Sequence, residues 1–214
     1  MSLAAAATVK SPPPRTPPAT LPGFEGLRRT YDEFTGRWLV HVMPGEYYVT
    51  RNDETLCTVL GSCISVCISV PTLGLGGMNH FLLPGDDGAV HGEVMRYGSY
   101  ALERLINEFV KYGAYRERLE IKLFGGGRVI NGNLDVGKSN IDYVHRYLKN
   151  EQLTIAAESL GGTIARKVQY HPLTGKAVMT EVPMTESVRV EQSAKDKAAA
   201  LKQQALAPSK VILF

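Results

Sequence analysis

Leu60-Gly61-Ser62-Cys63-Ile64-Ser65-Val66-Cys67-Ile68-Ser69-Val70 is the stretch that decides the fold of this chain. From Cys63 onward, small polar and β-branched apolar residues alternate strictly, which is typical of a β-strand with two different faces. One face carries Cys63, Ser65, Cys67 and Ser69, and the other carries Ile64, Val66, Ile68 and Val70. Gly61 tolerates backbone conformations that other residues avoid, so Leu60-Gly61-Ser62 predicts a tight turn before the strand.

Cys63 lies where this glycine turn enters the predicted strand. A thiol at that point is fixed in position and has backbone N–H groups of the turn close by, which makes Cys63 a candidate nucleophile. Cysteine is also among the residue types most often buried as a small apolar side chain. Taken alone, each of Cys57, Cys63 and Cys67 is therefore expected to be structural.

His80 is the residue that distinguishes Cys63 from the other two thiols. The run from Gly76 to Pro84 predicts a strand that follows a turn around residues 71–74. The two strands are then neighbours, and His80 can approach Cys63. A thiol and an imidazole are the minimum equipment for cysteine-based acyl transfer. A histidine within an apolar run is otherwise more often a hydrogen-bonded core residue.

The composition excludes several classes of protein. The 214 residues are 44% hydrophobic and 21% charged, which is ordinary for a globular chain. A net charge of +3 is too weak to indicate a nucleic-acid partner. No apolar run reaches the roughly 18 residues that predict membrane insertion. Three cysteines without a matching pair of histidines are not a usual zinc pattern, so we expect no metal, no cofactor and reduced thiols in a cytoplasmic protein.

The remaining elements predict a layered α/β unit with two tails. Residues 1–36 are expected to form a disordered Pro-rich arm and lead-in, residues 37–183 the folded domain, and residues 184–214 a tail with a marginal helix at 191–207. Strands are expected at 37–43, 47–50, 119–124, 153–158, 163–170 and 176–182, and a loop at 85–93. Helices are expected at 94–112, ended by Gly113, and from the N-cap Ser139 to about residue 149.

Five segments of the chain form one ordered set of motifs, which are Thr58-Val59-Leu60-Gly61-Ser62-Cys63, Asn79-His80-Phe81-Leu82-Leu83-Pro84, Tyr97-Gly98, Lys122-Leu123-Phe124-Gly125-Gly126-Gly127 and Val136-Gly137-Lys138-Ser139-Asn140. In this order they resemble the CheD family, the chemoreceptor glutamine deamidases of bacterial and archaeal chemotaxis. The resemblance covers roughly residues 42–182. The cysteine and histidine motifs, at this spacing, are its most specific part.

The resemblance implies a fold, a site and partners. The fold is α/β (α+β), a layered sandwich with central β-sheets flanked by helices, similar to the catalytic domains of deamidating toxins. The catalytic residues are Cys63, His80 and Thr58. The substrates are glutamines on the cytoplasmic helices of methyl-accepting chemotaxis receptors, with no nucleic acid and no membrane insertion, and a CheC-type phosphatase is a further partner.

The implied chemistry agrees with the residue types. A Cys63 thiolate would attack the glutamine amide, backbone groups at Gly61 and Ser62 would stabilise the oxyanion, and His80 would protonate the departing ammonia. A glutamine carried on a helix requires a shallow opening. Five glycines are candidates for letting that helix come close, and tight packing within the chain is the competing interpretation. These are Gly76, Gly77, Gly125, Gly126 and Gly127.

Three other interpretations stay open on the sequence alone. The chain is a non-catalytic adaptor that binds chemoreceptors or the CheC phosphatase, although binding needs neither Cys63 nor His80. It is a different thiol enzyme, such as a transglutaminase or a small-molecule amidase. Or it is a structural protein with buried cysteines, in which case Cys63 reacts no faster than Cys57 or Cys67 with a thiol reagent.

Overall fold

The computed structural model describes residues 16–83, 91–129, 135–183 and 185–190, and five positions between 192 and 200. Two five-stranded sheets form the centre of this part of the chain. The first sheet has the order β1 (Arg28–Asp32), β2 (Arg37–His41), β4 (Thr55–Leu60), β9 (Arg166–His171) and β10 (Lys176–Glu181). The second has the order β3 (Tyr47–Thr50), β6 (Leu75–Asn79), β5 (Ile64–Val70), β7 (Glu120–Gly125) and β8 (Ile155–Leu160).

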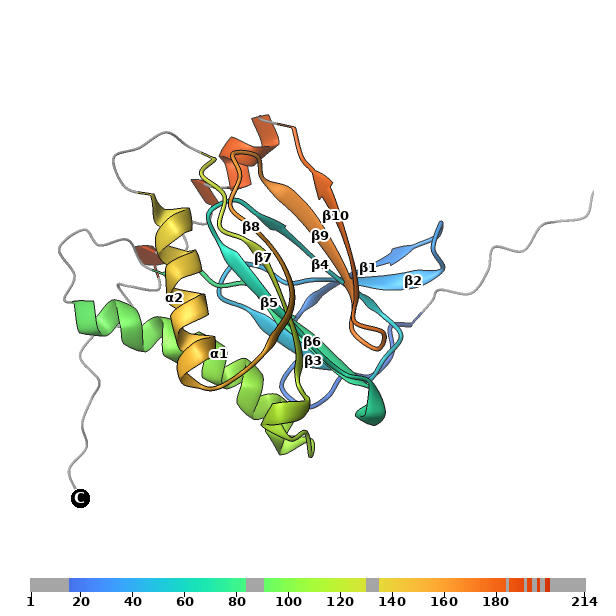
Figure 1. The fold of residues 1–214 in the computed structure, drawn as a ribbon. Helices are drawn as coiled ribbons and strands as arrows, with labels where there is room; N and C mark the ends of the chain where they lie inside the picture. Colours follow the sequence, from blue (N-terminus) through green and yellow to red (C-terminus); the bar gives the residue numbers. More distant parts are fainter. Residues whose placement is uncertain are drawn as a thin grey trace, which may run out of the picture.

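The two long helices lie on one side of the second sheet, and the first sheet lies on the other (Figure 1). They are α1 (His91–Lys111) and α2 (Val136–Asn150). Short 3-10 turns stand at η1 (Pro71–Leu73) and η2 (Arg116–Arg118). This order of layers, helices on sheet on sheet, confirms the expected sandwich with central β-sheets flanked by helices.

Strand β5 is buried on both faces, because it lies in the middle of the second sheet and between the two other layers. Its apolar face belongs to the core that the helices cover, where Leu102, Leu105, Ile106 and Phe109 of α1 are all buried. Its small polar face meets the first sheet and the β9–β10 turn, where a Cβ on Gly175 would lie 2.7 Å from Ser69 Oγ. The strict alternation in the sequence therefore reflects two different packing partners.

The folded part begins before residue 37, the start expected from the sequence. Strand β1 pairs with β2 in antiparallel register, and Phe24 is a buried core residue. A buried ion pair joins the two sheets here, since Arg29 of β1 lies 3.2 Å from Glu54, which also accepts a hydrogen bond from Tyr48 of β3 at 2.8 Å. The lead-in thus supplies an edge strand and a buried cation.

Both long helices begin earlier than expected from the sequence. Helix α1 begins at His91, inside the segment expected to be a loop, and Val110 of its predicted apolar stripe is 44% exposed. Helix α2 begins at Val136, because Asp135 is the N-cap and accepts a hydrogen bond from Lys138 N at 2.9 Å. Ser139, the predicted cap, lies in the first turn. Residues 84–90 and most of the tail helix expected at 191–207 lie outside the described residues.

Candidate active site

The strand that carries His80 breaks at that residue. Strand β6 ends at Asn79, and the next contact with β5 is the single bridge between Ile64 and Phe81. Between them, the His80 backbone is bound by the turn after β2. Its N–H donates to Glu46 O at 2.9 Å, and its carbonyl accepts from Gly45 N at 2.7 Å. These two hydrogen bonds hold the His80 backbone, and the His80 side chain lies between the two sheets, next to strand β4.

The bridge keeps the register of the β5–β6 ladder, in which Cys67 lies opposite Met78 and Ile64 lies opposite Phe81. In this register Cys63 faces Leu82, and His80 stands diagonally from Cys63 on the same face of the sheet. Diagonal positions are about 7–8 Å apart between Cα atoms, within reach of an imidazole. The structure therefore brings the predicted cysteine and histidine to one face of the second sheet. Both side chains are buried.

Thr58 of β4 faces the His80 ring from the first sheet. Its Oγ1 lies 2.7 Å from His80 Nδ1 and donates a hydrogen bond to the carbonyl of Val42, also at 2.7 Å. A hydroxyl has one proton, so Thr58 accepts from His80 Nδ1–H when it donates to Val42. The proton of the neutral ring is then on Nδ1, and Nε2 is the basic nitrogen. This geometry selects Thr58, five positions before the cysteine, as the neighbour of the imidazole.

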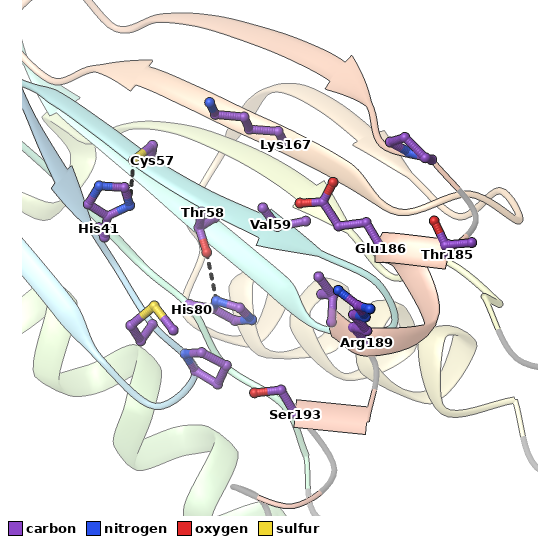
Figure 2. Close-up of a pocket in the computed structure, with 14 residues that line it drawn as sticks. His41, Cys57, Thr58, Val59, His80, Lys167, Thr185, Glu186, Arg189 and Ser193 are labelled. Atoms are coloured by element: carbon purple, nitrogen blue, oxygen red, sulfur yellow. Dashed lines mark hydrogen bonds between the residues drawn. The ribbon is translucent and has the colours of Figure 1, made fainter. Parts of the chain in front are cut away.

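A pocket of about 750 Å³ opens beside Thr58 and His80. The first sheet and the turn after β2 form one side of it, and residues after β10 form the other (Figure 2). Figure 2 shows Arg189 and Ser193 across from the His80 ring. Cys63 itself is fully buried and is not among the residues that line the pocket. The residues that line the pocket are His41, Met43, Pro44, Cys57, Thr58, Val59, His80, Lys167, Pro183, Thr185, Glu186, Arg189, Val190 and Ser193.

Another thiol and imidazole pair, Cys57 and His41, lines the pocket itself. Cys57 Sγ lies 3.4 Å from His41 Nδ1. Burial raises the pKa of the Cys57 thiol to about 11. Burial, together with the nearby cations Arg28 and Lys167, lowers the pKa of His41. Both groups are therefore neutral near pH 7, which does not favour Cys57 as a nucleophile. Cys67 is fully buried, and burial raises its pKa to about 12.

The five predicted glycines all pack closely against other parts of the chain. A Cβ atom added to Gly76 would lie 2.1 Å from Pro172 O, and one added to Gly77 would lie 2.3 Å from Tyr48 O. At Gly125 the nearest atom is Cys63 O at 2.1 Å, at Gly126 it is a side-chain carbon of Ile141, and at Gly127 it is Gly61 O. Packing within the chain accounts for these glycines. Their part in the approach of a substrate stays a prediction.

Sequence reasoning missed several residues near the site. Lys167, Glu186 and Arg189 line the pocket without any motif that would have marked them. Asn140 is fully buried on α2 and is hydrogen-bonded to the turn before Cys63. Its position at the end of the Val136–Asn140 motif was the available signal. Over the described residues, no group of three or more His, Cys, Asp or Glu side chains is arranged to hold a metal ion.

The fold and the site together define a two-sheet α+β protein with a buried cysteine and a histidine at the ends of neighbouring strands, the histidine bound by a threonine of the facing sheet. A thiol and an imidazole on one face are the equipment of cysteine acyl-transfer enzymes. Within the part of the chain that the structure describes, no helix combines the length and apolar character needed to span a membrane.

Comparison with known proteins identifies the family. The family model described as CheD chemotactic sensory transduction matches residues 82–181. A probable chemoreceptor glutamine deamidase CheD of Hahella chejuensis is 46% identical over 170 residues, 78% of this chain and 81% of the relative. The protein of the same name from Cupriavidus pinatubonensis is 45% identical over 203 residues, 92% and 93% of the two chains. The chain belongs to the CheD family.

Proposed function

We propose that this chain hydrolyses the side-chain amide of glutamines in methyl-accepting chemotaxis receptors, the activity for which its relatives are named. The observation that carries the proposal is the Thr58–His80 hydrogen bond of 2.7 Å, on the face of the sheet that also carries Cys63. A hydrogen bond on Nδ1 leaves Nε2 as the base, as a cysteine nucleophile requires. The Cys57–His41 pair is arranged similarly, since His41 Nε2 lies 2.9 Å from Thr30 Oγ1, but burial raises the pKa of the Cys57 thiol to about 11, which does not favour it as a nucleophile.

The first half-reaction forms a thioester. His80 Nε2 takes the proton of the Cys63 thiol, and the thiolate attacks the δ-carbon of the glutamine amide. The negative charge that develops on the amide oxygen is stabilised by backbone N–H groups of the turn at residues 61–63. His80 then gives its proton to the departing nitrogen, and ammonia leaves. Thr58 holds the ring in one orientation through both proton transfers.

The second half-reaction uses water. His80 Nε2 takes a proton from the water, and the resulting hydroxide attacks the thioester carbon. The thiolate of Cys63 leaves and recovers the proton from His80, and the product is glutamate. The glutamine side chain enters through the pocket beside His80, because the imidazole of His80 lines this opening. The receptor segments that carry such glutamines are cytoplasmic helices, so we place the activity in the cytoplasm.

The test is a reaction in water enriched in heavy oxygen, with a primary amine added. Purified chain is incubated with the cytoplasmic fragment of a chemoreceptor, and the modified peptides are read by mass spectrometry. The proposal predicts one heavy oxygen per converted glutamine and release of ammonia. Incorporation of the amine in preference to water would instead identify a transglutaminase.

Binding to a CheC-type phosphatase is a separate proposal that rests on the resemblance. It does not depend on the thiol, because association needs neither Cys63 nor His80. A complex that forms equally with the wild type and with Cys63→Ala, measured by light scattering, would support it. The absence of any complex at micromolar concentrations would contradict it without affecting the deamidase proposal.

A further inference from the structure

Three consecutive carbonyls of the turn before β5 accept hydrogen bonds from outside the turn. Gly127 N donates to Gly61 O at 2.7 Å, and Gly126 N donates to Cys63 O at 2.8 Å. The carbonyl between them, Ser62 O, accepts from the side-chain amide of Asn140 at 2.7 Å. Two of the three donors are backbone groups. The third is a side chain, and it belongs to helix α2.

Asn140 also binds the segment that follows the histidine. Its Oδ1 accepts a hydrogen bond from Leu83 N at 2.9 Å, and the side chain is fully buried. One amide group thus connects the residue before Cys63 with a residue three positions after His80. The contact depends on a close approach of α2, since a Cβ on Gly137 would lie 2.4 Å from Gly126 O.

Peptide geometry gives the hydrogen bond to Ser62 O a chemical consequence. The carbonyl of Ser62 and the N–H of Cys63 belong to one planar peptide unit, and this unit is trans. In a trans peptide the two groups point in opposite directions. Because Ser62 O points toward Asn140, Cys63 N–H points away from Asn140, and the hydrogen bond fixes that direction.

We propose that Asn140 is a positioning residue, which orients the Ser62–Cys63 peptide so that Cys63 N–H stabilises the oxyanion of the tetrahedral intermediate. The inference rests on the proposed function and adds a residue to it. The direction of Ser62 N–H is fixed in the same way. Gly127 N donates to the carbonyl of Gly61, which shares a peptide unit with Ser62 N–H. Asn140 touches neither substrate nor thiol, so its effect on the reaction passes through the peptide.

The experiment compares two reactions of the same thiol. Deamidation of a chemoreceptor fragment develops an oxyanion, whereas alkylation of Cys63 by iodoacetamide does not. Asn140→Asp keeps the acceptor for Leu83 N–H but removes the donor to Ser62 O. Val144→Ala is the matched control, because Val144 is a fully buried residue of the same helix that contributes to neither hydrogen bond. Circular dichroism and urea unfolding confirm that each variant is folded at the assay temperature.

For Asn140→Asp we expect kcat for deamidation to fall about 10- to 100-fold, less than the loss of about 10²–10³ that follows removal of an oxyanion donor. The KM for the receptor fragment and the pH dependence of Cys63 alkylation stay close to those of the wild type. The ratio of variant to wild-type kcat rises as the pH falls, because the introduced carboxyl group donates to Ser62 O once it is protonated, and burial raises its pKa. Val144→Ala keeps the wild-type kcat.

Two outcomes would overturn the role of Asn140. In the first, alkylation and deamidation fall by the same factor in Asn140→Asp, which would indicate a purely structural role. In the second, kcat is unchanged while the protein is folded. A wild-type protein that is alkylated at Cys63 but deamidates no receptor fragment would contradict the proposed function itself, and the two failures are therefore distinguishable.

Discussion

At the scale of single residues, the Thr58 hydroxyl decides which nitrogen of the neutral His80 ring is basic and so available as the proposed base. Its single proton is donated to Val42 O, so it accepts from Nδ1–H and leaves Nε2 for the thiol. The sequence alone left this point open, because the spacing of Thr58 and His80 in the chain does not show which nitrogen of the His80 ring carries the proton. The geometry also explains why a threonine is suited to the position, since its methyl group packs while its hydroxyl both donates and accepts.

Thr58→Val is expected to lower kcat about 10-fold, with little change in KM. The variant keeps the shape of the side chain but leaves Nδ1–H with the Val42 carbonyl, which is 3.4 Å away. The loss is moderate because that carbonyl still favours the same tautomer. Steady-state kinetics with a receptor fragment measures the effect, and Thr58→Ser, which keeps the hydroxyl, is the control. A Thr58→Val enzyme with full activity would remove Thr58 from the site.

The three thiols are expected to differ sharply in reactivity toward iodoacetamide. Burial raises the pKa of Cys57 to about 11 and that of Cys67 to about 12. Since a raised pKa keeps the thiol protonated until the pH exceeds it, both residues stay unreactive in the native protein at pH 7–8. Peptide mapping after a short exposure should therefore find label at Cys63 and, in Cys63→Ala, almost none. Labelling of Cys57 as fast as Cys63 would contradict this account.

At the scale of elements, the glycine run at the end of β7 supports the turn that carries Cys63, the proposed nucleophile. Gly125 has a φ of +110°, and an added Cβ would lie 2.1 Å from Cys63 O. Gly126 and Gly127 donate to the same turn. The sequence indicated close approach at these glycines, and the neighbours that come close are the backbone of the turn at Gly125 and Gly127 and the Ile141 side chain at Gly126. This places the strand end of β7 beneath the predicted oxyanion site.

Gly125→Ala is expected to lower the free energy of unfolding by about 2–5 kcal/mol, the sum of a left-handed backbone cost and of local overpacking. Gly113→Ala provides the matched control, because Gly113 also has a positive φ, +90°, but no atom within 4 Å of an added Cβ. It should lose only the backbone contribution of about 1–2 kcal/mol. Urea unfolding measures both. Equal losses of unfolding free energy in the two variants would show that the close packing of Gly125 against Cys63 does not contribute to stability.

The segment after β10 is the element that the sequence described least well. It was expected to be a tail with a marginal helix, lightly docked or frayed. In the structure Ser187 is fully buried, and Thr185, Glu186 and Arg189 line the pocket beside His80. Removal of residues 184–214 should therefore open one side of the pocket and make alkylation of Cys63 severalfold faster, with the melting temperature little changed. Slower alkylation in the truncated, folded protein would mean that the segment helps to build the site.

At the scale of the whole molecule, local patterns predicted the elements and part of the site. The alternation at residues 63–70 predicted β5 and its two faces, and the apolar stripe from Leu102 to Phe109 predicted the core face of α1. The spacing of Cys63 and His80 predicted neighbouring strands, since a turn joins them. These features depend on residues close together in the chain, where periodicity and turn chemistry are informative.

Contacts between distant segments could not be predicted in the same way. The ion pair of Arg29 with Glu54, the bond from Asn140 to Ser62 and the position of Arg189 each join elements from different layers. No local period marks such pairs, because each residue's role is set by a partner far along the chain. Asn140 shows this most clearly, as a buried polar residue on a helix face that otherwise packs apolar and aromatic side chains.

The central claim is that Cys63 and His80 convert receptor glutamine to glutamate. The most direct measurement is the intact mass of a chemoreceptor cytoplasmic fragment after incubation with the wild type, with Cys63→Ala, with His80→Ala and with Cys57→Ala. The account predicts a gain of about one mass unit per converted glutamine with the wild type and Cys57→Ala, and no gain with the other two variants. A gain that persists in Cys63→Ala, or that disappears in Cys57→Ala while that protein is folded, would contradict it.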